Sequence, residues 1–362
     1  MNFCKIVFLT ALLFLLMNCT NPESLVIEEL STFSGHTLYI TGYGTLYGTG
    51  SDLSGQLGNL GLTNVWEFQQ LLNDVTAISA GGAHSLVIRS DGNLWVTGNN
   101  AMGQSGTPNS GNVHDFTQTL AGVKYISAGY MYSMAIKNNG TLWACGKNNS
   151  GQLGNGDTSY MGNFGWEQVQ EGVRFVASGE EHTMLIKTND TLWATGRNQY
   201  GQFGVGDVNS VHSWVYIISN VQKVSLGESH SIILLKDSTA WTCGRNNRGQ
   251  LGLGNSTSYK TSWTMVMSNV LDIAARGNHS FILTKEQTLY GSGNNELHQL
   301  GKESFISTNC FIPVLDSVRI FTTGTSQSLA VLTDDTLWIT GNSWSGQLGT
   351  GTNETISAWE AK

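Results

Sequence analysis

Short apolar runs alternate with glycine-rich or polar breaks along almost the whole chain. One unit of this pattern contains four runs: "WEQVQ" (166–170), "VRFVAS" (173–178), "HTMLIK" (182–187) and "TLWATG" (191–196). Each run is rich in aromatic and β-branched residues and is too short for a globular helix. The break between the third and fourth runs is a tight polar turn, as hairpins require. The pattern therefore predicts four short antiparallel strands per unit.

The unit occurs seven times. Its most regular string is built around a glutamine in a glycine-rich turn such as "GQLG", and the seven copies carry Gln56, Gln104, Gln152, Gln202, Gln250, Gln299 and Gln347. Successive glutamines are 48, 48, 50, 48, 49 and 48 residues apart. A fixed period of this length, with four strands per unit, predicts an all-β, seven-bladed propeller. We expect the glutamine amides to hydrogen-bond the loop backbone, which is a structural role.

The order of the runs also predicts how the ring closes. An aromatic residue leads the run that follows each glutamine turn: Trp66, Phe116, Trp166, Trp214, Trp263, Phe311 and Trp359. The last of these runs stands at the C-terminus, whereas the N-terminal part opens on "SLVIEEL" (24–30), a run of the second type. We therefore expect the C-terminal strand to join the N-terminal blade, which would leave no open sheet edge.

Composition fits one folded, repeat-built domain over residues 26–362. Glycine supplies 44 of the 362 residues and proline only 3, so the glycines are expected to serve turns in a folded protein. The charged fraction is 12% and the formal net charge is −8. We expect no nucleic-acid partner, because phosphate binding requires clustered Lys and Arg.

The first residues are of a different kind. "MNFCK" is followed by the apolar run "IVFLTALLFLLM" (6–17), which is too short to span a bilayer and is typical of a signal peptide over residues 1–18. "LMNC" then resembles a bacterial lipoprotein signal, which implies a lipid on Cys19 and a short linker to residue 25. Export to the bacterial envelope as a lipid-anchored protein is the leading expectation. Secretion after ordinary cleavage, or an uncleaved anchor, is the alternative.

Two strings carry a family resemblance. "LWATGRNQYGQFGVGD" and "ASGEEHTMLI" look like the repeat of the regulator of chromosome condensation family, whose members fold as seven-bladed propellers, and the likeness extends over residues 26–362. Tyr132 and Gln327 stand where other copies carry histidine. Arg276 and Phe33 replace the first glycine of the preceding turn.

Histidines and cysteines do not predict a reactive centre. His36, His84, His182, His230 and His279 occupy one repeat position, and equivalent atoms on different blades cannot converge on a metal ion. We expect these histidines to bond nearby backbone, and we predict no metal and no cofactor. Cys145 and Cys243 share a strand position two units apart, so we expect buried side chains without a disulfide.

Loops that differ between units are the candidate binding surface. The loops joining second to third runs and fourth to first runs should share one face, where aromatic, Met and charged side chains favour a protein interface. The predicted partner-binding residues are Tyr130, Met131, Tyr160, Met161, Phe164, Glu180, Glu181, Tyr200, Glu228, Arg248 and Trp344.

Three classes of function compete. The leading one is a non-enzymatic module of the envelope, expected to be monomeric, that binds a protein partner through this face. The resemblance also implies guanine-nucleotide exchange, which fits poorly with an exported acidic chain that has no inserted hairpin. A glycan-active enzyme would need convergent carboxylates, and only Glu180, Glu181 and Glu228 are grouped on one rim.

Overall fold

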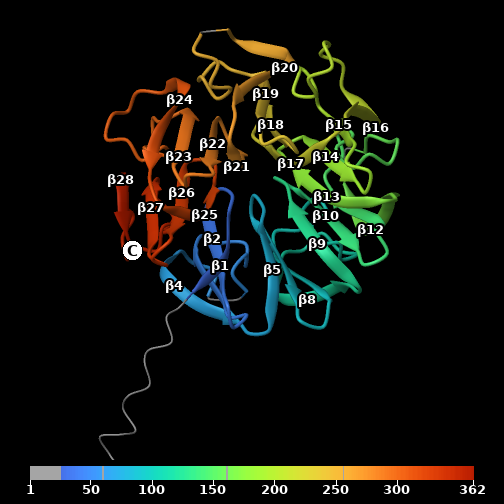
Figure 1. The fold of residues 1–362 in the computed structure, drawn as a ribbon. Coiled ribbons are helices and arrows are strands. Elements are labelled where there is room, and N and C mark those ends of the chain that lie inside the picture. The colour runs from blue at the N-terminus through green and yellow to red at the C-terminus, as the bar shows by residue number, and fades with distance from the viewer. Residues whose placement is uncertain (1–25, 59–60, 160–161, 256) are drawn as a thin grey trace, which may run out of the picture.

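The computed structural model describes residues 26–362 except 59–60, 160–161 and 256. The predicted signal peptide (1–18), Cys19 with its linker, Tyr160 and Met161 therefore lie outside the described residues. Seven four-stranded antiparallel sheets surround a central axis (Figure 1). This arrangement confirms the prediction of an all-β, seven-bladed propeller. The described residues contain no helix with the length and hydrophobicity needed to span a bilayer.

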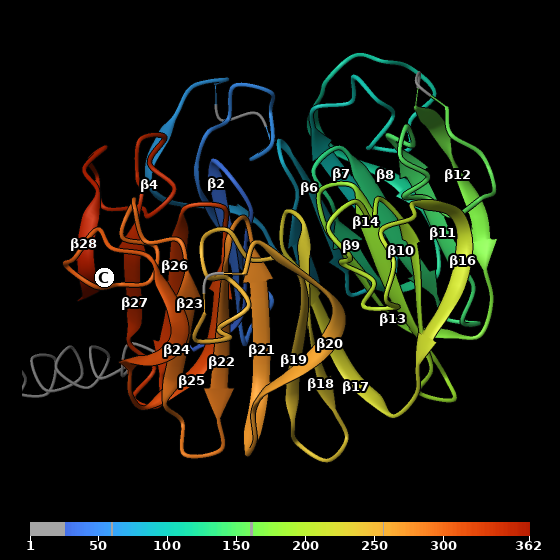
Figure 2. The same cartoon turned by 90° about the horizontal axis from the view of Figure 1, so that it is seen from above.

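Each blade uses four strands that are consecutive in the sequence (Figure 2). The first blade contains β1 (Ile27–Thr32), β2 (His36–Thr41), β3 (Leu46–Gly50) and β4 (Val65–Leu72). The second contains β5 (Val75–Ala80), β6 (His84–Arg89), β7 (Leu94–Gly98) and β8 (Val113–Leu120). The third contains β9 (Val123–Ala128), β10 (Tyr132–Lys137), β11 (Leu142–Gly146) and β12 (Asn163–Gln170). The fourth contains β13 (Val173–Ser178), β14 (His182–Lys187), β15 (Leu192–Gly196) and β16 (Val211–Ile218).

The remaining three blades follow the same plan. The fifth contains β17 (Val221–Leu226), β18 (His230–Leu235), β19 (Ala240–Arg245) and β20 (Tyr259–Met267). The sixth contains β21 (Val270–Arg276), β22 (His279–Thr284), β23 (Leu289–Gly293) and β24 (Thr308–Leu315). The seventh contains β25 (Val318–Thr323), β26 (Gln327–Leu332), β27 (Leu337–Gly341) and β28 (Ile356–Ala361).

The hydrophobic core lies between adjacent blades. Leu86 and Val96 of the second blade, for example, pack against Ile126 of the third. The second strand of each blade is covered on both faces, so β6 is buried from His84 to Ile88. The outermost strand β8 is instead half exposed. This difference explains why the run that forms the second strand of each blade, such as "HTMLIK" (182–187), is the most continuously apolar run in the sequence.

The prediction for ring closure is wrong. The C-terminal strand β28 pairs with β27 of its own blade, and the first blade is complete with β1 to β4. The aromatic-led strand therefore ends a blade instead of beginning the next one. The first blade also differs from the prediction in its aromatic residue, which is Phe68 instead of Trp66. In the second blade, Val96 pairs with Thr117, the residue after Phe116. The equivalent residue of the first blade, Gly48, pairs with Gln69, the residue after Phe68.

Non-covalent contacts close the ring between the seventh and first blades. The hydroxyl of Thr37 donates to the carbonyl of Gln347 at 2.7 Å. Arg319 Nη2 donates to the carbonyl of Ile27 at 2.8 Å. Phe68 packs so tightly on Gly349 that a Cβ there would lie 2.6 Å from its ring. Equivalent aromatics cover the equivalent glycines at the other joints, so this joint is built like the other six.

The repeated glutamines are structural, as predicted. In every unit the side-chain oxygen accepts a hydrogen bond from the backbone N–H two residues earlier, at 2.9 or 3.0 Å. The backbone carbonyl of the same glutamine accepts a hydrogen bond from a hydroxyl of the next blade, as Ser85 donates to Gln56 at 2.6 Å. One residue therefore folds its own loop and also joins two blades.

The five repeated histidines join neighbouring blades. His84 Nε2 lies 2.9 Å from Ser133 Oγ of the next blade, and Ser133 Oγ donates its own proton to the carbonyl of Gln104 at 2.6 Å. Nε2 of His84 must therefore carry a proton and donate. The structural role is confirmed, although the partner is a hydroxyl and not the expected backbone group. Burial lowers the pKa of His84 to about 3, so its ring is neutral.

Candidate protein-binding face

Loops from all seven blades gather at one end of the propeller, which we call the loop face. The loop after the innermost strand and the loop after the third strand of each blade end there, because antiparallel strands return every second connection to the same end. Tyr130, Glu180 and Glu228 occupy the same repeat position in the third, fourth and fifth blades. The fold therefore places three of the predicted residues side by side along one arc.

These residues line a small pocket on the loop face. A cavity of about 170 Å³ is bounded by Tyr130, Lys147, Glu180, Glu181, Arg197, Glu228 and Ser229. Four predicted residues, two of them from the turn between β13 and β14, thus meet in one place. The pocket is rich in charge and has a single aromatic wall, Tyr130, whose side chain is 41% exposed.

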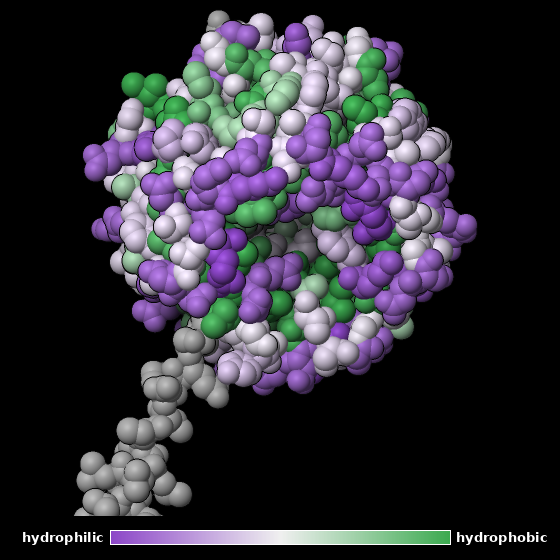
Figure 3. All heavy atoms as spheres, viewed as in Figure 1, coloured by the Kyte–Doolittle hydropathy of each residue, from purple (hydrophilic) through white to green (hydrophobic). Residues whose placement is uncertain are grey.

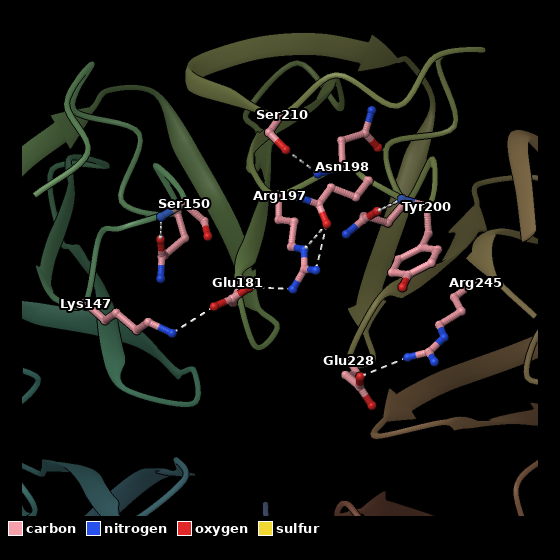
Figure 4. A network of polar contacts seen from close by, with 12 residues as sticks. Lys147, Ser150, Glu181, Arg197, Asn198, Tyr200, Ser210, Glu228 and Arg245 are labelled. Atoms are coloured by element: carbon pink, nitrogen blue, oxygen red, sulfur yellow. Dashed lines mark hydrogen bonds and ion pairs between the residues drawn. The ribbon is translucent and has the colours of Figure 1, made fainter. Parts of the chain in front are cut away.

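Glu181 is held between two cations (Figure 4). Its carboxylate accepts hydrogen bonds from Lys147 Nζ and Arg197 Nη1, each at 2.8 Å. Burial alone would raise the pKa of Glu181, but the hydrogen bonds and attraction from Lys147 and Arg197 outweigh it and lower the pKa below its ordinary value. Since Lys147 comes from the third blade and Arg197 from the fourth, Glu181 fixes two neighbouring blades at the rim.

Glu228 repeats this arrangement one blade further on. Its carboxylate accepts a hydrogen bond from Arg245 Nη1 at 3.1 Å and another from Asn278 Nδ2 at 2.6 Å. The guanidinium of Arg245 also lies 5.1 Å from the centre of the Tyr200 ring. Tyr200 is therefore oriented by a cation–π contact and stands beside the pocket.

Glu180 differs from its acidic neighbours. It has no hydrogen-bond or ion-pair partner among the described residues. Burial raises the pKa of Glu180 to about 7, repulsion from Glu228 adds to this rise, and Arg276 opposes it. At neutral pH this carboxyl is therefore divided between its protonated and ionised forms.

Two departures from the repeat meet beneath the loop face. The guanidinium of Arg276 lies 4.1 Å from the centre of the Phe33 ring, and Arg276 Nη1 donates to the carbonyl of Ser178 at 2.9 Å. These contacts link the sixth, first and fourth blades across the axis. Burial lowers the pKa of Arg276 to about 10, so it remains a cation at neutral pH.

The other predicted residues do not line the pocket. Arg248 forms an exposed ion pair with Glu296 at 2.5 Å, and Trp344 is 64% exposed on the seventh blade. Phe164 and Met131 are half-buried. The predicted partner-binding residues thus include the lining of one pocket and separate parts of the rim, and their role in binding stays a prediction.

Sequence reasoning missed several side chains on this face. Lys147, Arg197 and Arg245 each follow a glycine at the end of the third strand of their blade and precede an asparagine, so the recurring Gly-[Lys/Arg]-Asn string was the available signal. Leu53 is 66% exposed and occupies the repeat position of Trp344 on the neighbouring blade. Aligning the units would have predicted an apolar pair on the first and seventh blades.

The chemistry of the pocket suits recognition. Acid–base catalysis on a glycan needs two available carboxyl groups, whereas Glu181 and Glu228 are each held by cationic or amide partners. Within the described part of the chain, no three His, Cys, Asp or Glu side chains gather closely enough to hold a metal ion. Tyrosine and arginine side chains, such as Tyr130, Tyr200 and Arg245 on this face, are enriched at protein interfaces.

Comparisons with known proteins agree with this architecture. Human WBSCR16 is similar in structure, with a TM-score of 0.78, 17% identity, and coverage of 88% of this chain and 92% of that chain. Yeast RCC1 (Prp20), solved with Kap60 bound, has a TM-score of 0.76 and 18% identity, covering 85% of this chain and 82% of that chain.

A second structure, of Prp20p from Saccharomyces cerevisiae, has a TM-score of 0.77 and 18% identity and covers 93% of this chain and 87% of that chain. At these identities the likeness shows the fold alone. No curated protein sequence matched the chain. Residues 26–314, more than half of the sequence, match the RCC1-like domain. The chain therefore belongs to the RCC1-like domain family.

Proposed function

We propose that the chain is a non-enzymatic, protein-binding propeller of the bacterial envelope, which acts as a monomer and receives its partner on the loop face. The observation that carries this proposal is the contrast between repeat positions. The buried glutamine is kept in all seven blades and the buried histidine in five, whereas the loop position of Tyr130, Glu180 and Glu228 holds Ser, Gly or Thr in the other blades. These three residues line one pocket. Variation at a loop position is expected when a scaffold is retained and its loops are used for recognition.

A protein is the partner that this chemistry favours. The loop-face cations Lys147, Arg197, Arg245 and Arg248 are each bonded to a carboxylate, so they are not free to neutralise phosphates. The formal net charge of −8 also opposes a nucleic acid. Among the similar structures, yeast RCC1 was solved with Kap60, and the report on Prp20p concerns binding to Gsp1p and histones. Those partners support a protein ligand for this propeller as well.

Nucleotide exchange is the weaker candidate. Each of the seven blades has four strands and, in the described residues, all 28 strands belong to these blades. No further hairpin therefore projects from this part of the chain to enter a GTPase. Export through residues 1–18 and a lipid on Cys19 would in addition separate the protein from cytosolic GTPases.

Quantitative cross-linking in envelope preparations tests the loop face. A variant with Tyr130, Tyr200 and Trp344 changed to Ala should lose the cross-linked partner, because such aromatic anchors provide much of the affinity at protein interfaces. Tyr43→Ala is the matched control, since Tyr43 is 71% exposed in the β2–β3 hairpin at the opposite end. Both proteins should melt as the unchanged chain does. Equal cross-linking by the loop-face variant and the control would refute the proposal.

Membrane attachment is tested separately. Cys19→Ser should move the protein from the membrane fraction to the soluble fraction and abolish labelling by a radioactive fatty acid, because a thioether-linked lipid needs the thiol. Cys4→Ser, within the predicted signal peptide, is the control and should change neither result. Unchanged fractionation of Cys19→Ser would contradict lipid anchoring, although it would leave the binding proposal intact.

A further inference from the structure

The innermost strands surround a cavity on the propeller axis. Seven equivalent positions, fixed by the same pairing with the second strand, are held by Glu29, Ala77, Tyr125, Phe175, Lys223, Asp272 and Ile320. The first five of these residues line a cavity of about 240 Å³. Figure 3 shows the surface hollowed around the axis. A space of this size accepts a small organic molecule as readily as several waters.

The charges around this ring are not evenly distributed. Lys223 pairs with Asp272 at 2.5 Å on one side, so its charge is already neutralised. Glu29 lies in the first blade, between Ile320 of the seventh blade and Ala77 of the second. It forms no ion pair with a described residue. Its carboxyl accepts one hydrogen bond, from the backbone N–H of Ile78 at 3.3 Å. The side of the cavity that contains Glu29 is therefore acidic.

Tyr125 faces the same space. Its side chain is half-buried, and its phenol has no hydrogen-bond partner among the described residues. It is close enough to both Glu29 and Asp272 for their charges to raise its pKa, in addition to the larger effect of burial. Its ring centre lies 5.0 Å from that of Phe175, which forms the adjoining wall. A half-buried phenol without a partner and a half-buried carboxyl without a cation, both lining one cavity, mark a place for a ligand.

Other polar groups on the axis already have partners. Ser31, Ser79, Ser127 and Ser225 line the cavity, and each Oγ accepts a hydrogen bond from a backbone N–H of the next blade, at 2.9 or 3.0 Å. At the loop-face end, Arg276 reaches across the axis to Ser178. These serines hold the blades together, whereas Glu29 and Tyr125 are left to interact with whatever fills the cavity.

We propose that this cavity binds a small organic ammonium ion of about the size of choline, with its cationic head near Glu29 and against the rings of Tyr125 and Phe175. Carboxylates attract the charge, and the faces of Tyr125 and Phe175 stabilise an alkylated ammonium through cation–π contacts. Two cations line the cavity. Lys223 is paired with Asp272, and Arg276 donates to the carbonyl of Ser178 and packs on the Phe33 ring at the loop-face end, so an anion would compete with these partners. An inorganic cation would leave the aromatic walls without a role.

Isothermal titration of the full chain with choline tests the proposal, and 3,3-dimethylbutan-1-ol serves as the neutral molecule of the same shape. Choline should bind and the alcohol should bind at least roughly tenfold more weakly, since only choline gains the electrostatic contacts. Potassium chloride at the same ionic strength should not compete. Equal binding of the alcohol, full competition by potassium, or no heat with choline would each overturn the proposal.

Substitutions identify the residue that pairs with the charge. Glu29→Gln keeps the side-chain shape and the acceptor for Ile78, and should weaken choline binding roughly tenfold or more. Glu28→Gln, at the exposed neighbouring residue, is the matched control and should bind as the unchanged chain does. Ala77→Leu places bulk beside Glu29 and should also block binding. Choline affinity that is unchanged in both Glu29→Gln and Ala77→Leu would refute the site.

Proton release gives an independent readout. Burial raises the pKa of Glu29 to about 7, and the hydrogen bond from Ile78 opposes this rise. A bound cation would favour the ionised carboxylate, so choline affinity should rise with pH through about 7 and binding should release a proton. Tyr125, Lys223 and Arg276 also line the cavity, Asp272 is paired with Lys223, and all four residues remain in the Glu29→Gln variant. If the variant shows the same pH dependence, the response does not come from Glu29 and the assignment is wrong.

Discussion

His84→Gln should make the propeller less sensitive to acid. The histidine is neutral in the folded chain because burial lowers its pKa to about 3, whereas an unfolded histidine titrates near its ordinary value of 6.5. Between these values the unfolded chain binds more protons than the folded chain, so stability falls as the pH falls. Glutamine is a suitable replacement, since Gln327 occupies the same repeat position and donates to Thr32 Oγ1 at 2.7 Å.

The magnitude follows from the two pKa values. On going from about pH 7.5 to about pH 5.5, one histidine that stays neutral on folding removes about 1.4 kcal/mol from the free energy of unfolding. The other four, His36, His182, His230 and His279, are also buried with pKa values lowered to about 3 or 4. All five would remove about 7 kcal/mol, which is a large part of the ~5–15 kcal/mol typical of a folded domain.

Urea unfolding at the two pH values measures the effect. Glu29 and Glu180 act in the opposite sense, because their pKa values are raised and they favour the folded chain below pH 7. The informative quantity is therefore the difference between variant and unchanged chain, in which these terms cancel. His84→Gln should reduce the pH-dependent loss by about 1.4 kcal/mol. His114→Gln, an exposed position on β8, should leave it unaltered. An identical loss in His84→Gln and the unchanged chain would refute the reasoning.

Two further substitutions test the joint between the end blades and the loop-face charges. Gly349→Ala should lower the free energy of unfolding in urea by about 1–3 kcal/mol more than Gly92→Ala does. Both glycines have positive φ, but only at Gly349 would a Cβ collide with Phe68. Equal losses would show that packing at this joint contributes little to stability. Arg276→Met should raise the pKa of Glu180 above about 7, since Arg276 opposes that rise, and an unmoved carboxyl titration by NMR would contradict their coupling.

Periodicity predicted the number of blades and strands but not which run ends a blade. Each aromatic-led run is adjacent in sequence to the runs before and after it, so either neighbour could have paired with it. Only the hydrogen bonds decide this, and they join β28 to β27. The sequence also predicted Trp66 instead of Phe68 as the repeated aromatic residue of the first blade. Both residues lie in β4, and residue type alone does not determine how β4 is aligned with β3.

The candidate face was predictable in location but not in detail. Tyr130, Glu180 and Glu228 could be found because one loop position varied between units. Their cations could not be assigned in advance, since Lys147 and Glu181 belong to different blades and meet only when the ring is formed. Phe33 and Arg276 were each visible as departures from the repeat, whereas their contact across the axis depends on the three-dimensional arrangement.

The position of the two chain ends has a mechanical consequence. β1 is an innermost strand packed beside β5 and β25, whereas β28 is an outermost strand that pairs only with β27. A force applied at the C-terminus would separate only the outermost strand β28 and leave the seven-bladed ring intact. A force applied before β1 would act on the innermost strand of the first blade, and the loss of β1 would separate the first blade from the seventh. β1 also packs against strands of two neighbouring blades, so pulling it out should take more force than pulling out β28.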